Sequence, residues 1–279
     1  MAYFLMNIVT SLILLFIVGL SNADISFNNS YEPTWGENHL SIINQGTEVT
    51  LLLDNSSGAG FKSKFLYESG LFVIRMKLPD KKTGGVITSL YLTSQVDGSP
   101  PGTHDEIDFE FLGTQGKLQT NVFANDWGFR EQIFQLPFDP SQDFHTYQIL
   151  YNPFQIVFFI DDIPVREFMN LKVKANVNYP TSPMQIEASV WYSNSSGWAG
   201  DIDWSLAPFI AHYQHFKISG CFPQPGNDCS SPVNQPWNRF KVLSPLQRQK
   251  MANFRKQYMT YDYCVPGFVQ FPECSYNNS

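Results

Sequence analysis

Apolar and polar positions alternate in many short segments between Ile25 and Ile218. Alternation with a period of two, rich in aromatic and β-branched residues, predicts strands with one buried face and one polar face. Gly, Pro, Asn and Asp separate the segments, and helical periodicity is scarce there. Many strands at close spacing predict an all-β fold, an antiparallel β-sandwich or jelly roll. The clearest predicted strands are VTLLLD, GLFVIRMKLP, GVITSLYLTSQ, EIDFEFLG, LQTNVFA, TYQILYN, QIVFFID and MQIEASVWY.

One predicted strand carries three carboxylates on a single face. In HDEIDFEFLG, Glu106, Asp108 and Glu110 alternate with apolar residues, so all three acids point the same way. Like charges at this spacing repel each other, which should raise the pKa of at least one carboxyl group. A protonated carboxylic acid beside an ionised one is the pair that acid–base catalysis uses. The alternative is a solvated strand face, although such a face usually mixes charges of both signs.

Two carboxyl groups that flank a glycosidic bond can hydrolyse it. A gap of about 5 Å gives retention through a covalent intermediate, and roughly 6.5–9.5 Å gives inversion through a water molecule. Residues i and i+4 on a strand have α-carbons about 13 Å apart, so side chains that lean together bring Glu106 and Glu110 to roughly 5–7 Å, which favours retention. Asp108 has a shorter side chain and suits a helper. A metal site that adds His104 and Asp105 is an alternative, although a regular strand presents its ligands in a line.

The composition changes after Gly220, where Cys, Pro and Gly become frequent. The segment SPLQRQKMANFRKQYMTYDYC then has the best helical pattern in the chain. We predict a β domain over residues 24–218 and a Cys-rich extension with one helix over residues 219–279. One apolar stripe should pack this helix on the β domain. The expected stripe consists of Leu246, Met251, Phe254 and Tyr258.

All four cysteines lie in this extension. An even number of cysteines in an exported chain predicts two disulfides, and the sequence alone permits three connectivities. The pairs that close the shortest loops are Cys221 with Cys229 and Cys264 with Cys274. The alternative of a metal site is disfavoured because the CxxC spacing of zinc sites is absent.

The N-terminus has the features of a secretion signal. The apolar run from Ile8 to Leu20 is too short to span a bilayer comfortably, and small residues follow it at positions 21–23. We therefore expect residues 1–23 to be removed as a signal peptide and the mature protein to be secreted. Sequons for N-glycosylation, which are compatible with export, begin at Asn28, Asn55, Asn194 and Asn277.

Charge and aromatic content narrow the choice of partner. The net charge of −7 over 279 residues argues against nucleic acid or an anionic membrane surface. A neutral polysaccharide is unaffected by this charge, and aromatic faces stack well on sugar rings. Most aromatic residues must fill the core, but Trp191, Tyr192 and Trp198 lie among polar residues and glycines and are candidates for a cleft. Trp35 and Trp237 could belong to either.

Several motifs together resemble a known family. HDEIDFEFLG is followed by QTNVF, FREQIFQLPFDP, FHTYQILYN, PMQIEASVW and DWSLAPFIAHYQHF, and the tail contains MTYDYC. This set is similar to the plant xyloglucan endotransglucosylase/hydrolases of glycoside hydrolase family 16. The similarity extends from about Ser26 to Cys274. It implies a curved β-jelly roll with a long open cleft across one sheet.

The resemblance also implies a mechanism. Glu106 would be the nucleophile, Asp108 the residue that positions and polarises it, and Glu110 the general acid/base. A xyloglucan donor would be cut, and the covalently held piece passed to a glucan oligosaccharide acceptor or to water, without a cofactor or metal. The expected enzyme is a monomer of the cell wall and apoplast. The match implies substrate binding by Gln119, Thr120, Asn121, Arg130, Glu131, Trp198 and Gly200, to which Trp191 is added as an aromatic cleft residue.

The sequence departs from the family pattern in its loops. No sequon follows the catalytic strand, where residues 113–116 read GTQG, and an aromatic residue, Phe129, precedes the arginine of the FREQ motif. The loop between Trp191 and Trp204 is short and has Gly197 before its tryptophan. These changes predict altered contacts with the substrate. They leave two alternatives open: the same chemistry on undecorated or mixed-linkage β-glucan, and a glucan-binding wall protein with impaired catalysis.

Overall fold

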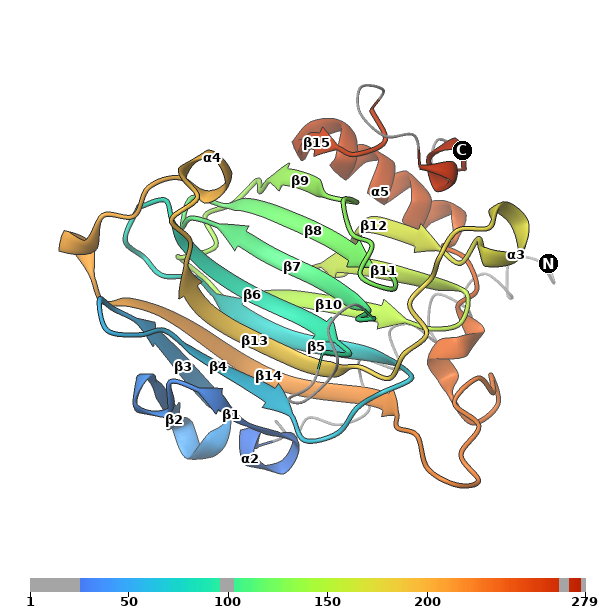
Figure 1. Ribbon diagram of the computed structural model, residues 1–279, viewed down its shortest axis with the longest axis horizontal. Coiled ribbons are helices and arrows are strands. Elements are labelled where there is room, and N and C mark those ends of the chain that lie inside the picture. Colours follow the sequence, from blue (N-terminus) through green and yellow to red (C-terminus); the bar gives the residue numbers. More distant parts are fainter. Residues whose placement is uncertain (1–25, 96–102, 266–270, 277–279) are drawn as a thin grey trace, which may run out of the picture.

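The computed structural model describes residues 26–95, 103–265 and 271–276, so the predicted signal peptide and the sequon at Asn277 lie outside it. Within these ranges two antiparallel sheets pack face to face (Figure 1). The predicted antiparallel β-sandwich is therefore confirmed. In spatial order, the eight-stranded sheet consists of β1 (Tyr31–Trp35), β4 (Ala59–Ser63), β13 (Gln185–Tyr192), β6 (Val86–Thr93), β7 (Glu106–Leu112), β8 (Lys117–Phe123), β9 (Gln132–Gln135) and β15 (Met259–Asp262). The seven-stranded sheet consists of β12 (Ile163–Met169), β11 (Gln155–Ile160), β10 (His145–Tyr151), β5 (Ser69–Lys77), β14 (Phe209–Cys221), β3 (Glu48–Leu53) and β2 (Leu40–Ile43).

Helices occupy only short connections and the C-terminal extension. The α-helices described are α2 (Phe27–Ser30), α3 (Lys172–Ala175), α4 (Ser196–Ala199) and α5 (Pro245–Tyr258). Single 3₁₀ turns are η1 (Glu37–His39), η2 (Asn44–Gly46), η3 (Trp204–Leu206), η4 (Pro236–Arg239) and η5 (Pro272–Ser275). In the part of the chain that the structure describes, no helix combines the length and apolar character needed to cross a membrane.

The core between the sheets fixes the orientation of β7. Ile107, Phe109 and Phe111 are fully buried, as the alternation in this strand predicts. The Phe109 ring meets the Phe158 ring edge to face, with centroids 5.0 Å apart. Burial of each large apolar side chain contributes roughly 1.5–3 kcal/mol to folding. Because this face is anchored in the core, the acids of the same strand must point to the opposite face of the sheet.

Helix α5 begins with a capping box. The Ser244 side chain accepts a hydrogen bond from the Gln247 backbone N–H, and the Gln247 side chain accepts one from the Ser244 N–H. Of the expected stripe, Phe254 is buried against Phe134 of β9, and Met251 and Tyr258 pack on the core clusters. Leu246 is 58% exposed, so its inclusion in the stripe was wrong. The first turn of α5 presents this residue to solvent instead of to the sheet.

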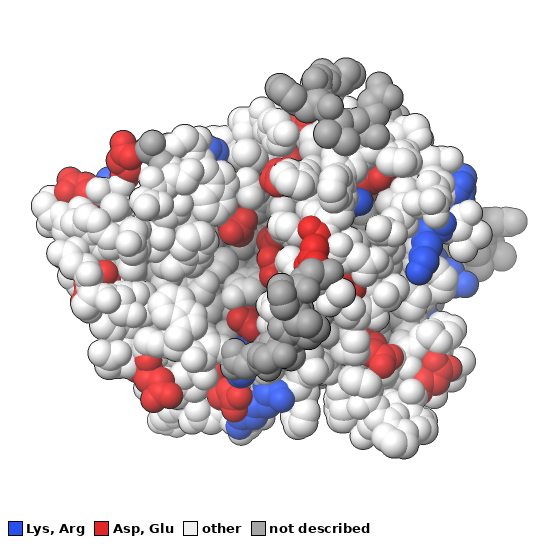
Figure 2. Space-filling model, in the orientation of Figure 1, with Lys and Arg blue, Asp and Glu red and all other residues white. Residues whose placement is uncertain are grey.

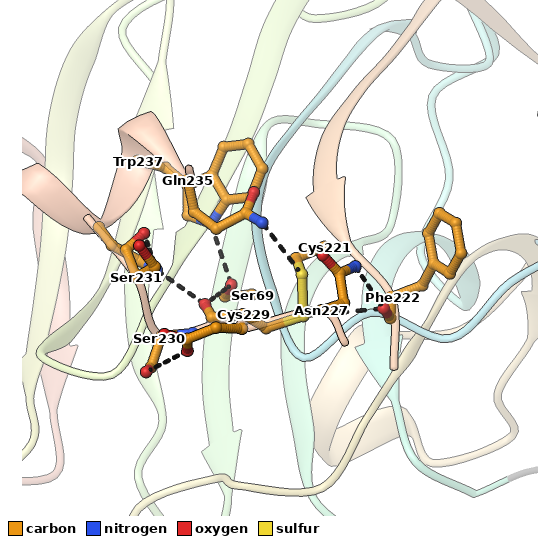
Figure 3. The surroundings of a disulfide bond; sticks show 11 residues. Ser69, Cys221, Phe222, Asn227, Cys229, Ser230, Ser231, Gln235 and Trp237 are labelled. Carbon is orange, nitrogen blue, oxygen red and sulfur yellow. Dashed lines mark hydrogen bonds between the residues drawn. A yellow bond between two sulfur atoms is a disulfide. The ribbon is translucent and has the colours of Figure 1, made fainter. Parts of the chain in front are cut away.

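Two disulfides hold the extension, and both are the pairs that close the shortest loops. Cys221–Cys229 lies where β14 ends, and Cys264–Cys274 closes the segment after β15. Ser69 of β5 donates a hydrogen bond to the Cys229 carbonyl at 2.9 Å and accepts one from the Trp237 indole at 3.0 Å (Figure 3). Trp237 thus fastens the extension to the seven-stranded sheet and takes no part in the acidic face.

Candidate active site

The three acids of β7 line an open cleft on the eight-stranded sheet. In register, Glu106, Asp108 and Glu110 lie beside Phe123, Asn121 and Gln119 of β8. Figure 2 shows acidic side chains within the hollow of this face. The cleft has a volume of about 540 Å³ and crosses the strands from β7 to β15, a size typical of ligand sites. Its lining residues are Glu106, Asp108, Glu110, Gln119, Asn121, Phe123, Glu131, Ile133, Trp198 and Tyr261.

Asp108 lies deepest of the three acids and is 4% exposed. Burial, followed by the charges of Glu106 and Glu110, raises the pKa of Asp108 well above its usual range. Burial also raises the pKa of Glu106, against the effects of hydrogen bonds from Thr93 and Asp108 and of the charge of His104. The shared hydrogen bond therefore runs from a protonated Asp108 to the Glu106 carboxylate. This arrangement keeps Glu106 as the ionised member of the pair.

Glu110 is set apart by its environment. Burial, together with the charge of Glu106, raises the pKa of Glu110 to about 7. Gln119 donates a hydrogen bond to Glu110 Oε2 at 3.0 Å and accepts one from the Trp198 indole at 3.1 Å. The Trp198 ring comes from the short helix α4 and packs beside Trp191, with ring centroids 6.0 Å apart. A chain of hydrogen bonds thus orients a carboxyl group that gains and loses its proton near neutral pH.

The far side of the cleft is built by β9 and β15. The Asn121 side chain donates a hydrogen bond to Glu131 Oε1 at 3.2 Å, and its own carbonyl accepts one from the Arg130 backbone N–H. Ile133 of β9 is paired in register with Tyr261 of β15. Since β15 belongs to the C-terminal extension, this extension supplies part of the cleft wall.

A buried arginine lies under β8, on the core side of the cleft floor. Arg166 of β12 donates hydrogen bonds to the Thr120 carbonyl, the Thr120 hydroxyl and the Arg130 carbonyl at 2.7–2.9 Å. Its guanidinium lies 5.6 Å from the Phe158 ring centroid. Burial lowers the pKa of Arg166 to about 10, so the group stays charged at neutral pH. Its positive charge reaches Asp108 and partly offsets the rise in the pKa of that acid.

A second buried arginine joins the β8–β9 turn to the C-terminal tail. Arg130 is 3% exposed, and its Nε donates to Glu273 Oε1 at 2.6 Å. A second nitrogen, Nη1, donates to the Trp127 carbonyl at 2.5 Å. Glu273 lies in η5, beside the second disulfide, and is itself buried. The ion pair therefore fixes the position of the turn relative to the extension.

The structure brings together some of the predicted binding residues. Gln119, Asn121, Glu131 and Trp198 line the cleft. Thr120 faces the core because β8 alternates, and the Arg130 guanidinium is held by Glu273, so the structure brings neither into the cleft. Trp191 is half-buried behind Trp198, and Tyr192 packs on Trp204. Gly200 has a φ of +79° and serves the turn after α4.

Three lining residues were missed by the sequence prediction. Phe123 continues the alternation of Gln119 and Asn121 along β8, so the period of two could have found it. Ile133 and Tyr261 meet only because β15 returns to pair with β9, across more than a hundred residues of chain. As for the metal alternative, no cluster of three or more His, Cys, Asp or Glu side chains among the described residues could hold an ion. Asp105 instead accepts hydrogen bonds from the backbone of Asn125, Thr181 and Ser182.

Two glutamates side by side in an open cleft are the arrangement with which glycoside hydrolases cut a glycosidic bond. Residues 27–206 match glycosyl hydrolases family 16, and residues 231–265 match the xyloglucan endo-transglycosylase C-terminus. The chain belongs to family 16 and, within it, to the plant xyloglucan endotransglucosylase/hydrolases.

Individual relatives agree with this assignment. The chain is 48% identical over 273 residues to the putative xyloglucan endotransglucosylase/hydrolase protein 1 of Arabidopsis thaliana. This match covers 93% of this chain and 90% of the relative. A probable xyloglucan endotransglucosylase/hydrolase protein of Nicotiana tabacum is 41% identical over 87% of this chain and 84% of its own. Among solved structures, the Bacillus licheniformis beta-glucanase is 26% identical, with a TM-score of 0.58 over 70% of this chain and 96% of its own.

Proposed function

We propose that this protein cuts the β-1,4-glucan backbone of xyloglucan and joins the cut end to a glucan acceptor or to water. The observation that carries the proposal is the row of Glu106, Asp108 and Glu110 in a cleft that is open enough for a polymer. The match of the tail to the xyloglucan endo-transglycosylase C-terminus supports this choice of substrate. The reaction uses side chains alone and needs no cofactor or metal.

In the first step, the Glu106 carboxylate attacks the anomeric carbon. The bond from that carbon to the leaving oxygen breaks, and Glu110 gives its proton to this oxygen. The pKa of Glu110, raised by burial to about 7, keeps the group protonated in mildly acidic surroundings. Asp108, which is held protonated by burial, donates a hydrogen bond to Glu106 and so keeps the attacking oxygens ionised and oriented.

In the second step, the hydroxyl group of an acceptor attacks the glycosyl-enzyme. Glu110 takes the proton from this hydroxyl group, the ester bond to Glu106 breaks, and the configuration at the anomeric carbon is retained. A glucan acceptor gives transfer and water gives hydrolysis, and the outcome depends on how well the acceptor is bound. Gln119, Asn121, Glu131, Trp198 and Tyr261 supply the polar and aromatic contacts for the sugars around the reacting bond.

We further propose that the protein acts as a secreted glycoprotein of the cell wall and apoplast. Asn28, Asn55 and Asn194 are exposed, as glycosylation requires, and the two disulfides suit an oxidising compartment. Enzymatic deglycosylation of the protein secreted by plant cells should lower its mass, and substitution of each asparagine by glutamine should show which sequons are used. An unchanged mass would contradict the glycosylation.

The activity is tested by incubating the protein with a polysaccharide and a fluorescent acceptor oligosaccharide. With xyloglucan as donor, we expect label to move into the polymer and the polymer to shorten. Label transferred only into cellulose or mixed-linkage β-glucan would support the same chemistry on another substrate and overturn the choice of xyloglucan. Binding without transfer or new reducing ends would overturn the enzymatic function. Proton NMR of the first product should show the retained anomer.

A further inference from the structure

The turn between β8 and β9 exposes two large aromatic side chains. Trp127 is 51% exposed and Phe129 is 64% exposed. Their rings meet edge to face, with centroids 5.6 Å apart, so together they form one apolar patch. Paired aromatic residues that remain in water on a turn do not stabilise a core, and such patches mark sites of interaction.

The backbone of this turn is held in an unfavourable conformation. Asn125, Asp126 and Phe129 have positive φ angles of 52°, 61° and 60°. Asn and Asp tolerate this region, but for a bulky residue such as Phe it is a real outlier that costs on the order of 1–3 kcal/mol. The conformation that presents the Phe129 ring to solvent therefore lowers the stability of the fold.

Partly buried hydrogen bonds and one buried ion pair keep the turn in place. Asp105, next to Glu106, accepts a hydrogen bond from the Asn125 backbone N–H at 2.9 Å. The Asp126 N–H donates to the His104 carbonyl at 2.8 Å, and the His104 and Asp126 side chains pair with each other. The Arg130–Glu273 ion pair holds the other end through the Trp127 carbonyl. The aromatic pair is therefore fixed relative to the catalytic strand.

The patch continues one margin of the cleft. Phe123 lines the cleft opposite Glu106, and the backbone of Gly128 packs directly on the Phe123 ring, where any side chain would collide. Trp127 and Phe129 are the sequence neighbours of Gly128, so the aromatic pair lies next to Phe123 at this margin of the cleft.

The direction of the cleft indicates which part of a substrate reaches the patch. The lining residues run across the strands from β7 to β15, so a glucan backbone lies along that line. The patch lies off this line, beyond the ends of β7 and β8 at which Glu106 pairs with Phe123, so a glucan bound along the cleft would reach it only through a branch. The charges in the turn are paired, which suits a neutral ligand such as a sugar ring stacked on an aromatic face.

We infer that Trp127 and Phe129 form a binding site for a neutral branch sugar of the glucan substrate, and so favour branched over unbranched chains. This inference rests on the function proposed above and adds a determinant of specificity to it. Trp127 and Phe129 touch no reacting group, so their role is to position the substrate.

The test compares Trp127→Ala and Phe129→Ala with the unchanged protein on branched xyloglucan oligosaccharides and unbranched cello-oligosaccharides of equal backbone length. We expect kcat/KM to fall about tenfold on the branched acceptors and less than about twofold on the unbranched ones. Phe65→Ala is the matched control, because Phe65 is 53% exposed and stacked on Phe222, outside the residues that line the cleft. An equal loss on both acceptors, or no loss on either, would overturn the inference. Absence of any transfer by the unchanged protein would refute the proposed function instead.

A second variant separates binding from folding. Glycine adopts a φ of +60° without strain, so Phe129→Gly should raise the unfolding temperature and still reduce the preference for branched acceptors. If Phe129 had only a structural role, removal of its ring would lower the unfolding temperature and leave the preference unchanged. That result would contradict the branch site.

Discussion

Two groups of buried charges lie on opposite sides of the eight-stranded sheet, and the protein treats them differently. On the cleft side, Glu106, Asp108 and Glu110 crowd together, and no Lys or Arg is among the described residues that line the cleft. On the core side, Arg130 is neutralised by Glu273, and Arg166 is surrounded by carbonyl and hydroxyl oxygens.

The difference shows which charges have a structural role and which have a chemical one. A buried ion that only stabilises the fold needs a permanent partner, because desolvation is expensive. The acids lack such a partner, and burial raises the pKa of all three instead. Repulsion by neighbouring acids adds to the rise for Asp108 and Glu110. The acids can therefore exchange protons, whereas Arg130 and Arg166 keep a fixed charge.

The largest effect is expected from the acids. Glu106→Ala removes the group that forms the covalent intermediate, and we expect kcat to fall by about a thousandfold or more while oligosaccharide binding persists. Glu167→Gln, which changes a carboxylate on β12 away from the cleft, should leave kcat within about twofold. Transfer of a fluorescent acceptor measures kcat, and calorimetric titration measures binding. Substantial turnover by Glu106→Ala would remove this residue from the role of nucleophile.

On the cationic side, the expected effect is on stability. Glu273→Gln leaves the buried Arg130 charge without its partner, so the free energy of unfolding should fall by about 3–5 kcal/mol. Asp161→Asn is the control, because it weakens a partly exposed ion pair with His145 and should cost less than about 1 kcal/mol. Urea unfolding measures both. Equal losses would show that the buried pair has no special role.

The pH dependence of stability sharpens the comparison further. Burial and the charge of Glu106 raise the pKa of Glu110 to about 7, above about 4.3 in an unfolded chain. The folded protein therefore binds this proton more tightly, and the resulting stabilisation is complete at low pH and lost as pH rises through about 7. Glu110→Gln cannot ionise, so its free energy of unfolding should fall less between about pH 4.5 and about pH 8. Urea unfolding at both pH values measures this free energy. If it changed by the same amount between the two pH values in the unchanged protein and in Glu110→Gln, the raised pKa of Glu110 would be contradicted.

The sequence predicted the sandwich and the acidic row because both depend on local periodicity. Alternation alone puts Glu106, Asp108 and Glu110 on one face, and extended to β8 it places Gln119 and Asn121 beside them. The same rule turns Thr120 to the core, where the motif match had suggested a binding role.

Contacts between distant segments could not be predicted in this way. The pairing of Arg130 with Glu273 and of Ile133 with Tyr261 depends on how the extension returns to the sheet. The aromatic patch on the β8–β9 turn depends on positive φ angles that the sequence does not reveal. Where a residue's role depends on a neighbour far along the chain, only the folded structure assigns it.

The smallest effect is expected at the edge of the sheet. Trp35 is paired in register with Gly60, and the row continues through Ser189 and Ser89 to Glu110. A side chain at Gly60 would meet the Trp35 indole, so the indole covers β4 on the face of the acids, at the end of a row of small residues. Three strand spacings, roughly 14 Å, separate β4 from β7, a distance that only a substrate of several sugars spans.

Trp35→Ala should therefore lower kcat/KM roughly two- to tenfold on long glucans and leave the shortest active oligosaccharide unaffected, while Trp35→Phe keeps most of the activity. A length series of oligosaccharides measures this effect. If the loss were the same at every length, Trp35 would be acting on the fold and not on the substrate, and the cleft would end before β4. A loss confined to long chains would show that the substrate site extends from the acids of β7 across the sheet to Trp35 beside β4.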